Sequence, residues 1–256
     1  MKPREPLAGA APANDNNPCA HCLLRASGEF LAVSPSERDA IESFRKGARV
    51  VKAGAAVIEE HRPSRQLFTL YSGWAFRYKT LSDGRRQILS FLLPGDFLGL
   101  QDEFDDGHTH GVEAATDVTL CVFKRGELWD LFHSQPRLGY DITWLAAREE
   151  KIVDDNLVTA GRRNASERVA MLLLHLYRRA RRVGMEREGW VEFPFNQQHI
   201  ADALGLSLVH TNKTLRSLAR QGLHRIDSGW LRILDPHALE ALGDYFEQPV
   251  RPMPLI

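Results

Sequence analysis

Cysteine is the residue type in this chain best suited to bind a metal or to undergo redox chemistry, and it occurs three times in 256 residues. Cys19 and Cys22 form a Cys-x-x-Cys pair near the N-terminus, and Cys121 lies far along the chain in an apolar stretch. Such a pair can form a disulfide, supply half of a zinc site, or have no chemical role. Cys121 alone fits a small buried side chain as well as a ligand.

A second set of possible metal ligands lies between positions 102 and 110. His108 and His110 stand close to Asp105 and Asp106, and imidazole and carboxylate groups both bind metals. Four carboxylates between positions 102 and 106 are more typical of a solvated acidic loop. We therefore expect a loop here rather than a metal site.

The residues best suited to contact DNA lie at positions 196–220, where the pattern predicts two short helices. Gly205 lies between them, where the turn needs a residue that tolerates a positive φ, and Ser207 can cap the second helix. The predicted inner side consists of His199, Ile200, Ala203, Leu204, Leu208, Thr211, Leu215 and Leu218. The outer side is basic and hydrogen-bonding, with His210, Asn212, Lys213, Arg216 and Arg220. The segment therefore predicts a helix-turn-helix that enters a DNA major groove.

The next residues, 223–234, predict two short strands around an Asp-Ser-Gly turn. A hairpin after a helix-turn-helix makes a winged helix, and Arg225 and Arg232 lie on the wing, which commonly follows DNA phosphates. An ordinary helical hairpin with solvated charges is the alternative. Charge favours DNA, because residues 162–235 hold 13 basic and 7 acidic side chains while the whole chain holds 33 of each.

Length and composition indicate two modest domains of an ordinary globular protein. No apolar run is long enough to span a bilayer, and the first residues lack the apolar core of a secretory signal. We therefore expect a cytoplasmic protein without membrane contact. The opening segment, rich in Ala, Pro and Asn, is expected to be disordered or loosely packed, and so is the tail from Pro249.

Short β-branched, aromatic or alternating stretches follow one another between positions 45 and 123, separated by glycines. The predicted strands are 50–51, 56–59, 67–71, 74–80, 87–92 and 118–123. Because no helix intervenes, they favour an antiparallel barrel or roll.

The sequence becomes helical again from position 126 to about 161. Apolar residues recur there at three- and four-residue steps, namely Leu138, Ile142, Leu145 and Ile152. This stripe is typical of a dimerisation helix, although Glu149, Asp155 and Thr159 continue it with polar side chains.

The chain resembles the cyclic-AMP receptor / fumarate-and-nitrate-regulator (CRP/FNR) family of bacterial transcription factors, over roughly residues 19–245. The resemblance rests on Leu93-Pro-Gly-Asp96, on the Asn-Ala-Ser-Glu-Arg-Val-Ala segment at 164–170, and on Ala-Leu-Gly-Leu at 203–206. It implies an α+β fold with an N-terminal cyclic-nucleotide-binding-like β-roll, a long dimerisation helix and a C-terminal winged helix-turn-helix. It also implies a homodimer on a pseudo-palindromic double-stranded DNA site, with RNA polymerase as an expected partner.

On this basis we expect five regions. They are a flexible N-terminal segment with the Cys-x-x-Cys pair at 1–30, a roll sensor domain at 31–135, a dimerisation helix at 136–162, a winged-helix DNA-binding domain at 163–245, and a tail at 246–256.

Cyclic AMP is not an expected ligand. Family members that bind it place Gly-Glu-Leu and then Arg-Ser or Arg-Thr around the phosphate, whereas the corresponding stretch here, 95–110, contains no arginine. A cyclic phosphate would meet carboxylates with no cation to pair with it.

Oxygen-sensing family members hold a [4Fe–4S] cluster with N-terminal cysteines and one cysteine from the last roll strand. Cys19, Cys22 and Cys121 fall on positions that resemble those ligands, and thiolates are natural ligands for a cluster. The family pattern has a further cysteine where this chain has Gly28. The fourth ligand of such a cluster could be Glu29, an Asp or His from elsewhere in the chain, or an exogenous group. Redox-active thiols, a regulator with no cofactor, and a roll that binds a different small effector remain alternatives.

The long helix adds a hypothesis about a dimer switch at Ile152 and Asp155. Oxygen-sensing relatives carry an acid at a position resembling Asp155, which the family is thought to use to keep cluster-free chains apart. Equivalent acids in a parallel helix pair would face one another and oppose association. An exposed helical acid without such a role is the alternative.

The predicted DNA contacts are Ser207, Val209, His210, Asn212, Lys213 and Arg216. The fumarate-and-nitrate type carries Glu, Ser and Arg where this chain has Val209, Asn212 and Lys213, so we expect a different operator. An enzyme is not expected, because the Cys-x-x-Cys of a thiol–disulfide oxidoreductase normally opens a helix after a strand.

Overall fold

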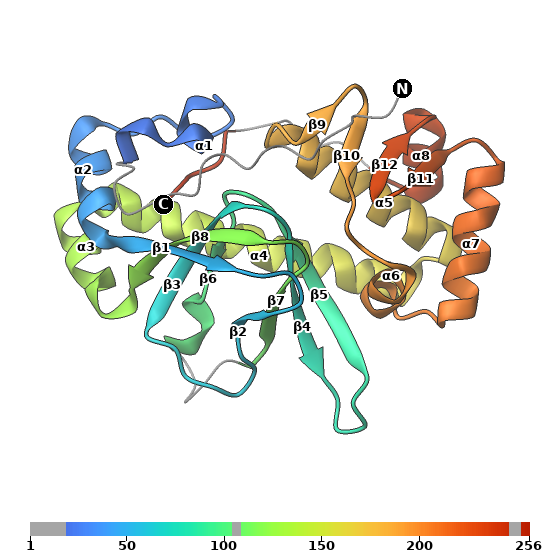
Figure 1. Cartoon of the computed structure of the whole chain (residues 1–256), viewed down its shortest axis with the longest axis horizontal. Helices are drawn as coiled ribbons and strands as arrows, with labels where there is room; N and C mark the ends of the chain where they lie inside the picture. The colour runs from blue at the N-terminus through green and yellow to red at the C-terminus, as the bar shows by residue number, and fades with distance from the viewer. Residues whose placement is uncertain (1–18, 104–108, 246–251) are drawn as a thin grey trace. The chain divides into compact units, whose positions relative to one another are not determined.

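A computed structural model describes residues 19–103, 109–245 and 252–256 of the chain (Figure 1). These residues divide into two compact units. The roll unit contains the described residues of 19–79, 92–151 and 252–256, and the winged-helix unit contains residues 80–91 and 152–245. No helix in the described ranges is both long enough and apolar enough to cross a membrane.

Two sheets face each other across an apolar core that both contribute to. Their strands are β1 Arg45–Val51, β2 Ala56–Ile58, β3 Gln66–Ser72, β4 Ala75–Thr80, β5 Arg86–Leu92, β6 Phe97–Leu98, β7 Gly111–Ala114 and β8 Val118–Lys124. The strand orders are β1-β8-β3-β6 and β2-β7-β4-β5. Every stretch predicted as a strand overlaps an observed strand, although β1 begins five residues before the predicted stretch at 50–51. The short strands β6 and β7 are not predicted, because two to four residues are too few to show an alternation.

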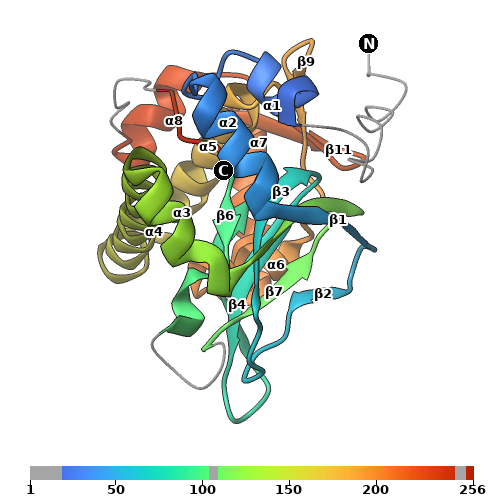
Figure 2. The same ribbon diagram turned by 90° about the vertical axis from the view of Figure 1, so that its left-hand side faces the viewer.

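Helices α2 and α3 lie beside each other at one end of the roll (Figure 2). The helical segments of this region are η1 Cys19–His21, α1 Leu23–Ala26, α2 Pro35–Phe44, η2 Leu100–Glu103, η3 Arg125–Glu127, α3 Leu128–Ser134 and α4 Pro136–Arg162. Helix α2 was not predicted from the sequence, although a capping box between Ser34 and Glu37 marks its start. Pro35 at the first helical position strengthens that signal.

Three of the four apolar residues of the α4 stripe pack inside the roll unit, and the fourth, Ile152, is also buried within the chain, so our assignment of this stripe to a dimer seam is wrong. Leu138, Ile142 and Leu145 join side chains of α2 and α3 in one buried cluster. Glu149, which continues the stripe, forms an ion pair with the buried Arg77 of β4 at 3.5 Å. A helical repeat of apolar residues identifies a buried face, but it does not identify the surface that buries it.

The winged-helix unit combines helices with a small antiparallel sheet of order β11-β12-β10-β9. Its elements after α4 are α5 Ala165–Arg182, β9 Glu186–Arg187, β10 Trp190–Glu192, α6 Gln197–Leu204, α7 Leu208–Arg220, β11 His224–Asp227, β12 Trp230–Ile233 and α8 Pro236–Gly243. Asn164 caps α5 by accepting from the amides of Ser166 and Glu167. The predicted fold class, an α+β chain with a roll, a long helix and a winged helix-turn-helix, is confirmed.

The C-terminal residues 252–256 pack into the roll unit, so our expectation of a loosely packed tail is wrong for this part. Met253, Leu255 and Ile256 are buried. Met253 forms a parallel bridge with Phe30. The segment is too short to show a periodic pattern, which is why its burial does not follow from the sequence. Residues 1–18 and 249–251, also expected to be loosely packed, lie outside the described residues.

Candidate functional site

The first candidate site is the pair of helices α6 and α7 with the turn between them. Gly205 ends α6 with a φ of 63°, a conformation that glycine adopts without strain. Ser207 begins α7, and its side-chain oxygen accepts a hydrogen bond from the His210 amide at 3.2 Å. Asn196 caps α6 in the same way through the His199 amide at 2.9 Å. The geometry of the turn therefore follows from the local sequence.

The inner sides of α6 and α7 differ in detail from the prediction. The buried residues are Ile200, Ala201, Leu204, Thr211, Thr214, Leu215 and Leu218. Leu208, predicted for the core, is 43% exposed, because it is the first residue of α7 and precedes the buried stripe. Ala203 and His199 are half-buried, so the packed face of α6 is centred on other residues.

The outer side of α7 is available to a DNA groove. Val209 is 79% exposed, and His210, Lys213 and Arg216 are also exposed. Asn212 differs, because its Oδ1 atom is buried and has no hydrogen-bond partner among the described residues. This side chain would have to turn outward to reach a base. The assignment of these residues to base contacts stays a prediction.

Arg168 of α5 holds the turn between α6 and α7 in place, a role that was not predicted from the sequence. Its guanidinium donates to the carbonyls of Leu204 and Arg163 at 2.8 Å each. Arg168 thus satisfies a carbonyl at the end of α6 that has no partner within that helix. It lies in the 164–170 motif, which is the signal that could have identified it.

The wing is the hairpin of β11 and β12. Ser228 and Gly229 form its two-residue loop with φ values of 52° and 79°. Positive φ at both positions is the geometry that suits the twist of a tight hairpin. The hairpin predicted from the Asp-Ser-Gly signal is confirmed.

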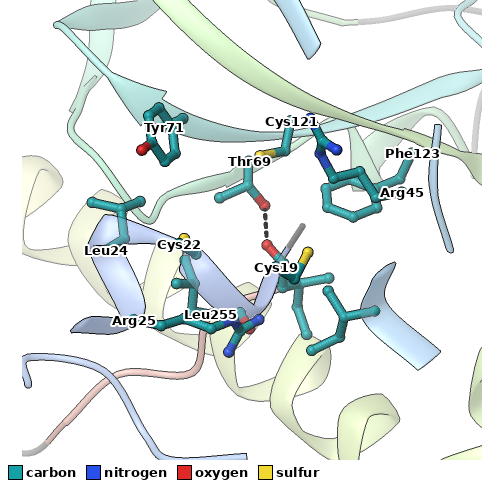
Figure 3. Close-up of a pocket in the computed structure, with 12 residues that line it drawn as sticks. Cys19, Cys22, Leu24, Arg25, Arg45, Thr69, Tyr71, Cys121, Phe123 and Leu255 are labelled. Carbon is teal, nitrogen blue, oxygen red and sulfur yellow. Dashed lines mark hydrogen bonds between the residues drawn. The ribbon is translucent and has the colours of Figure 1, made fainter. Parts of the chain in front are cut away.

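The second candidate site is a pocket of the roll unit that all three cysteines line (Figure 3). Cys19 and Cys22 come from η1 and the start of α1, and Cys121 comes from β8, opposite Thr69 of β3. The cavity that these residues line is small, about 20 Å³. The other lining residues are Leu24, Arg25, Ile41, Arg45, Thr69, Tyr71, Phe123, Leu255 and Ile256.

The C-terminal residues contact both the N-terminal segment that carries Cys19 and Cys22 and the sheet that carries Cys121. Arg25, on the segment that carries Cys19 and Cys22, donates from Nη2 to the Leu255 carbonyl at 2.8 Å. Thr69 donates from Oγ1 to the Ile256 carbonyl at 2.7 Å, as the dashed line in Figure 3 shows. This arrangement does not follow from the sequence, because each contact joins residues far apart in the chain and leaves no local signal.

Burial disfavours the thiolate form of two of the pocket cysteines, Cys19 and Cys121. Desolvation raises the pKa of Cys19, and it raises the pKa of Cys121 to about 11, while the positive charge of Arg45 acts in the opposite direction on both. Burial also lowers the pKa of Arg25, which the neighbouring cysteines oppose. A metal that binds here would have to displace protons from these thiols.

The donor set fits an iron–sulfur cluster in kind, because three thiols meet at one pocket beside two guanidinium groups. Within the described ranges, no three His, Cys, Asp or Glu side chains lie close enough to hold one metal ion. An iron–sulfur cluster does not require its ligands to meet at one metal ion, because each cysteine binds a different iron atom. In the acidic loop, Asp105, Asp106 and His108 lie outside the described residues, and His110 is buried.

The Leu93-Pro-Gly-Asp96 motif has a structural role at the contact between the roll and α4. The Asp96 carboxylate is 2% exposed, accepts from the Leu93 amide at 2.7 Å and pairs with Arg148 of α4 at 2.8 Å. Gly95 has a φ of 94°, and an added Cβ there would lie 2.4 Å from the Phe30 ring. Both positions are thus used to pack the roll. The absence of cyclic AMP binding stays a prediction.

Comparison with known proteins identifies two domains. Residues 48–135 match the cyclic nucleotide-binding domain family, and residues 167–242 match the Crp-like helix-turn-helix domain family. The first match identifies the type of domain and does not show that the domain binds a cyclic nucleotide.

Two regulators are similar over most of the chain. The nitrogen fixation regulation protein FixK of Bradyrhizobium diazoefficiens is 34% identical over 88% of this chain and 93% of its own length. The transcriptional activatory protein AadR of Rhodopseudomonas palustris is 33% identical over 87% of this chain and 92% of its own length. The solved structure of FixK2 from Bradyrhizobium japonicum aligns with a TM-score of 0.69 at 28% identity, over 76% of this chain and 96% of that one. Their names describe regulators and not enzymes.

Proposed function

The chain belongs to the CRP/FNR family of DNA-binding transcription regulators, and from that premise we propose that it senses oxygen or redox state through Cys19, Cys22 and Cys121. The observation that carries the proposal is that all three cysteines line one pocket. They come from two segments far apart in the chain, and the chain has no other cysteine. Three isolated structural cysteines would not be expected to meet in this way.

We infer that the sensing group is a [4Fe–4S] cluster held by the three thiolates and by one ligand other than cysteine. A cluster in this pocket would supply redox chemistry that responds to oxygen. Arg25 and Arg45 would offset the negative charge of the thiolates. Glu29 does not line the pocket, and no Asp, Glu or His is among the lining residues. We therefore favour an exogenous fourth ligand.

We also propose that the regulator acts as a homodimer on a pseudo-palindromic DNA site and contacts RNA polymerase there. The exposed side of α4 supports a dimer, since Val153, Leu157 and Val158 leave apolar surface uncovered in the single chain. Of the two residues assigned to the dimer switch, Ile152 is buried within the chain and Asp155 is exposed. Asp155 is therefore the one that a partner helix can meet.

The test of cysteine-based sensing is an anaerobic purification followed by visible absorbance, iron and acid-labile sulfide analysis, and a gel shift, each before and after exposure to air. We expect a brown protein that bleaches in air, loses iron and sulfide, and binds DNA less tightly afterwards. Cys121→Ser should be colourless. Tyr71→Phe is the matched control, because it changes a lining residue of the same pocket without removing a thiol.

Two results would contradict the cluster. The first is a colourless and iron-free wild-type protein, and the second is a Cys121→Ser variant that keeps its iron. If the colourless protein bound DNA differently after oxidation of Cys19 and Cys22, sensing would lie in the thiols. If DNA binding were the same for reduced and oxidised protein, redox sensing would be wrong and the DNA-binding function would stand.

A further inference from the structure

A row of arginines and one tryptophan crosses the small sheet of the winged-helix unit. Arg225 of β11 lies opposite Arg232 of β12, and Trp190 of β10 lies opposite Arg187 of β9. The β10–β12 register places Trp190 next to Arg232 and so joins the two pairs into one row. Residues directly opposite each other in a sheet share a face. The row spans four strands, or about 14 Å.

This row lies on the outer face of the sheet. Arg225 and Arg232 are exposed, whereas Leu231 and Ile233, which alternate with Arg232 along β12, are buried. Val191, next to Trp190 on β10, is buried with them. The two arginines are therefore available to a partner, and the inner face belongs to the core of the unit.

Trp190 lies close to both exposed arginines. The Cζ atoms of Arg225 and Arg232 lie 6.0 Å and 5.9 Å from the centroid of its ring. A guanidinium over the face of an indole is attracted by the negative potential of the ring. Arg232 also passes close to Gly189, where an added Cβ would make ordinary van der Waals contact with Arg232 Nε at 3.4 Å. Trp190 is 6% exposed, as expected for a side chain that lies beneath others.

The arrangement brings like charges together. Two cations directly opposite each other in an antiparallel pair repel, and the sheet is less stable for it. Asp227 offsets part of this repulsion by pairing with Arg225 at 3.3 Å. An anion bound between the arginines would remove the repulsion, and the anion that a DNA-binding unit meets in quantity is the phosphate of the DNA backbone.

We propose that Trp190 is a platform that fixes Arg225 and Arg232 for one stretch of DNA backbone, so that the sheet face is a second phosphate contact beside α7. Guanidinium groups held in place can pair with phosphate oxygens through two hydrogen bonds each. Arg187 extends the row by one strand. The proposal rests on DNA binding, which the family establishes, and not on the sensing role of the cysteines.

The first test compares the wild-type protein with an Arg225→Ala, Arg232→Ala variant on a random-sequence duplex of about 40 base pairs, or four turns. Affinity is measured by fluorescence anisotropy over a range of salt concentrations. The slope of log affinity against log salt should become shallower by about 1.8, since each phosphate that the protein no longer neutralises accounts for about 0.9. Arg85→Ala is the matched control, an exposed arginine on the loop between β4 and β5 that pairs with Asp83. An unchanged slope in the double variant would overturn the phosphate contact.

The second test asks whether Trp190 acts through the arginines. Trp190→Phe keeps a ring and should keep most of the affinity. Trp190→Leu should lower affinity in the wild-type background and have no further effect in the Arg225→Ala, Arg232→Ala background. Equal losses in both backgrounds would assign Trp190 to stability alone and refute the platform. If the leucine variant fails to melt cooperatively, Trp190→Met, which keeps more of the buried volume, replaces it in the same comparison.

Discussion

Lys213 is the residue of α7 that best tests how this protein discriminates between DNA sequences. It is exposed on the same helix as Val209, which has no hydrogen-bonding group to offer a base. A lysine can donate to guanine, though without the paired geometry of arginine.

We expect Lys213→Ala to weaken binding to the selected operator by roughly 1–3 kcal/mol and to weaken binding to random DNA by less. The measurement is a titration of both duplexes at one salt concentration. Arg220→Ala, at the far end of the same helix, is the comparison for a charge removed away from the turn. Equal losses on the two duplexes would show that Lys213 contacts only phosphate.

Asp96 is the residue on which the contact between the roll and α4 depends most directly. Asp96→Ala would leave Arg148, whose side chain is only 17% exposed, without its buried carboxylate partner, so the free energy of unfolding should fall by about 3 kcal/mol. Arg62→Ala, which breaks the exposed pair with Glu59, should cost less than about 1 kcal/mol. Urea denaturation of the three proteins gives the comparison. Similar losses of unfolding free energy in the two variants would mean that the Asp96–Arg148 pair stabilises the protein no more than an exposed ion pair does.

Helices and turns that are specified by neighbouring residues can be predicted from the sequence. The turn between α6 and α7 is encoded by Asn196, Gly205 and Ser207, each of which acts on its immediate neighbours. The stripe on α4 is also predicted, but its partner is not, because Leu138 and Ile142 would show the same spacing against another chain or against α2. The position of the C-terminal segment could not be predicted from the sequence. It depends on contacts with Phe30 and Thr69, and the segment has no periodicity of its own.

The C-terminal segment should control access to the cysteines. Deletion of residues 252–256 removes Leu255 and Ile256 from the pocket lining and leaves Arg25 and Thr69 without the carbonyls to which they donate. We expect faster maleimide labelling of Cys19 and Cys121, measured by mass spectrometry of the iron-free protein. Leu234→Asp, at an exposed leucine of the winged-helix unit, is the control and should label as the wild type does. Unchanged labelling after the deletion would show that the segment does not limit access.

At the scale of the whole molecule, the dimer switch predicts how association depends on charge. Asp155→Ala should strengthen dimerisation of the cofactor-free protein, because it removes one acid from each helix of a parallel pair. Sedimentation velocity over a range of protein concentrations measures the change. Asp154→Ala is the matched control, since adjacent residues on a helix lie about 100° apart around its axis. The same dimer affinity for wild type and Asp155→Ala would refute the switch, and a gain in Asp154→Ala alone would move it by one residue.

The cysteine pocket shows what a whole fold adds to a sequence. The resemblance to a family marks Cys19, Cys22 and Cys121 as possible partners, but only the fold brings them to one pocket. The arginines beside them, Arg25 of α1 and Arg45 of β1, follow from no motif, because they become neighbours of the cysteines only in the folded pocket.

The buried position of Ile256 has a practical consequence for anyone who produces this protein. Its carbonyl accepts from Thr69 and its side chain is enclosed, so an affinity tag joined directly to residue 256 would lie next to the pocket and would disturb this contact. A preparation tagged at that end would then have an altered cysteine environment before any experiment began. Iron content, colour and thiol reactivity should therefore be measured on protein that carries no tag joined to residue 256.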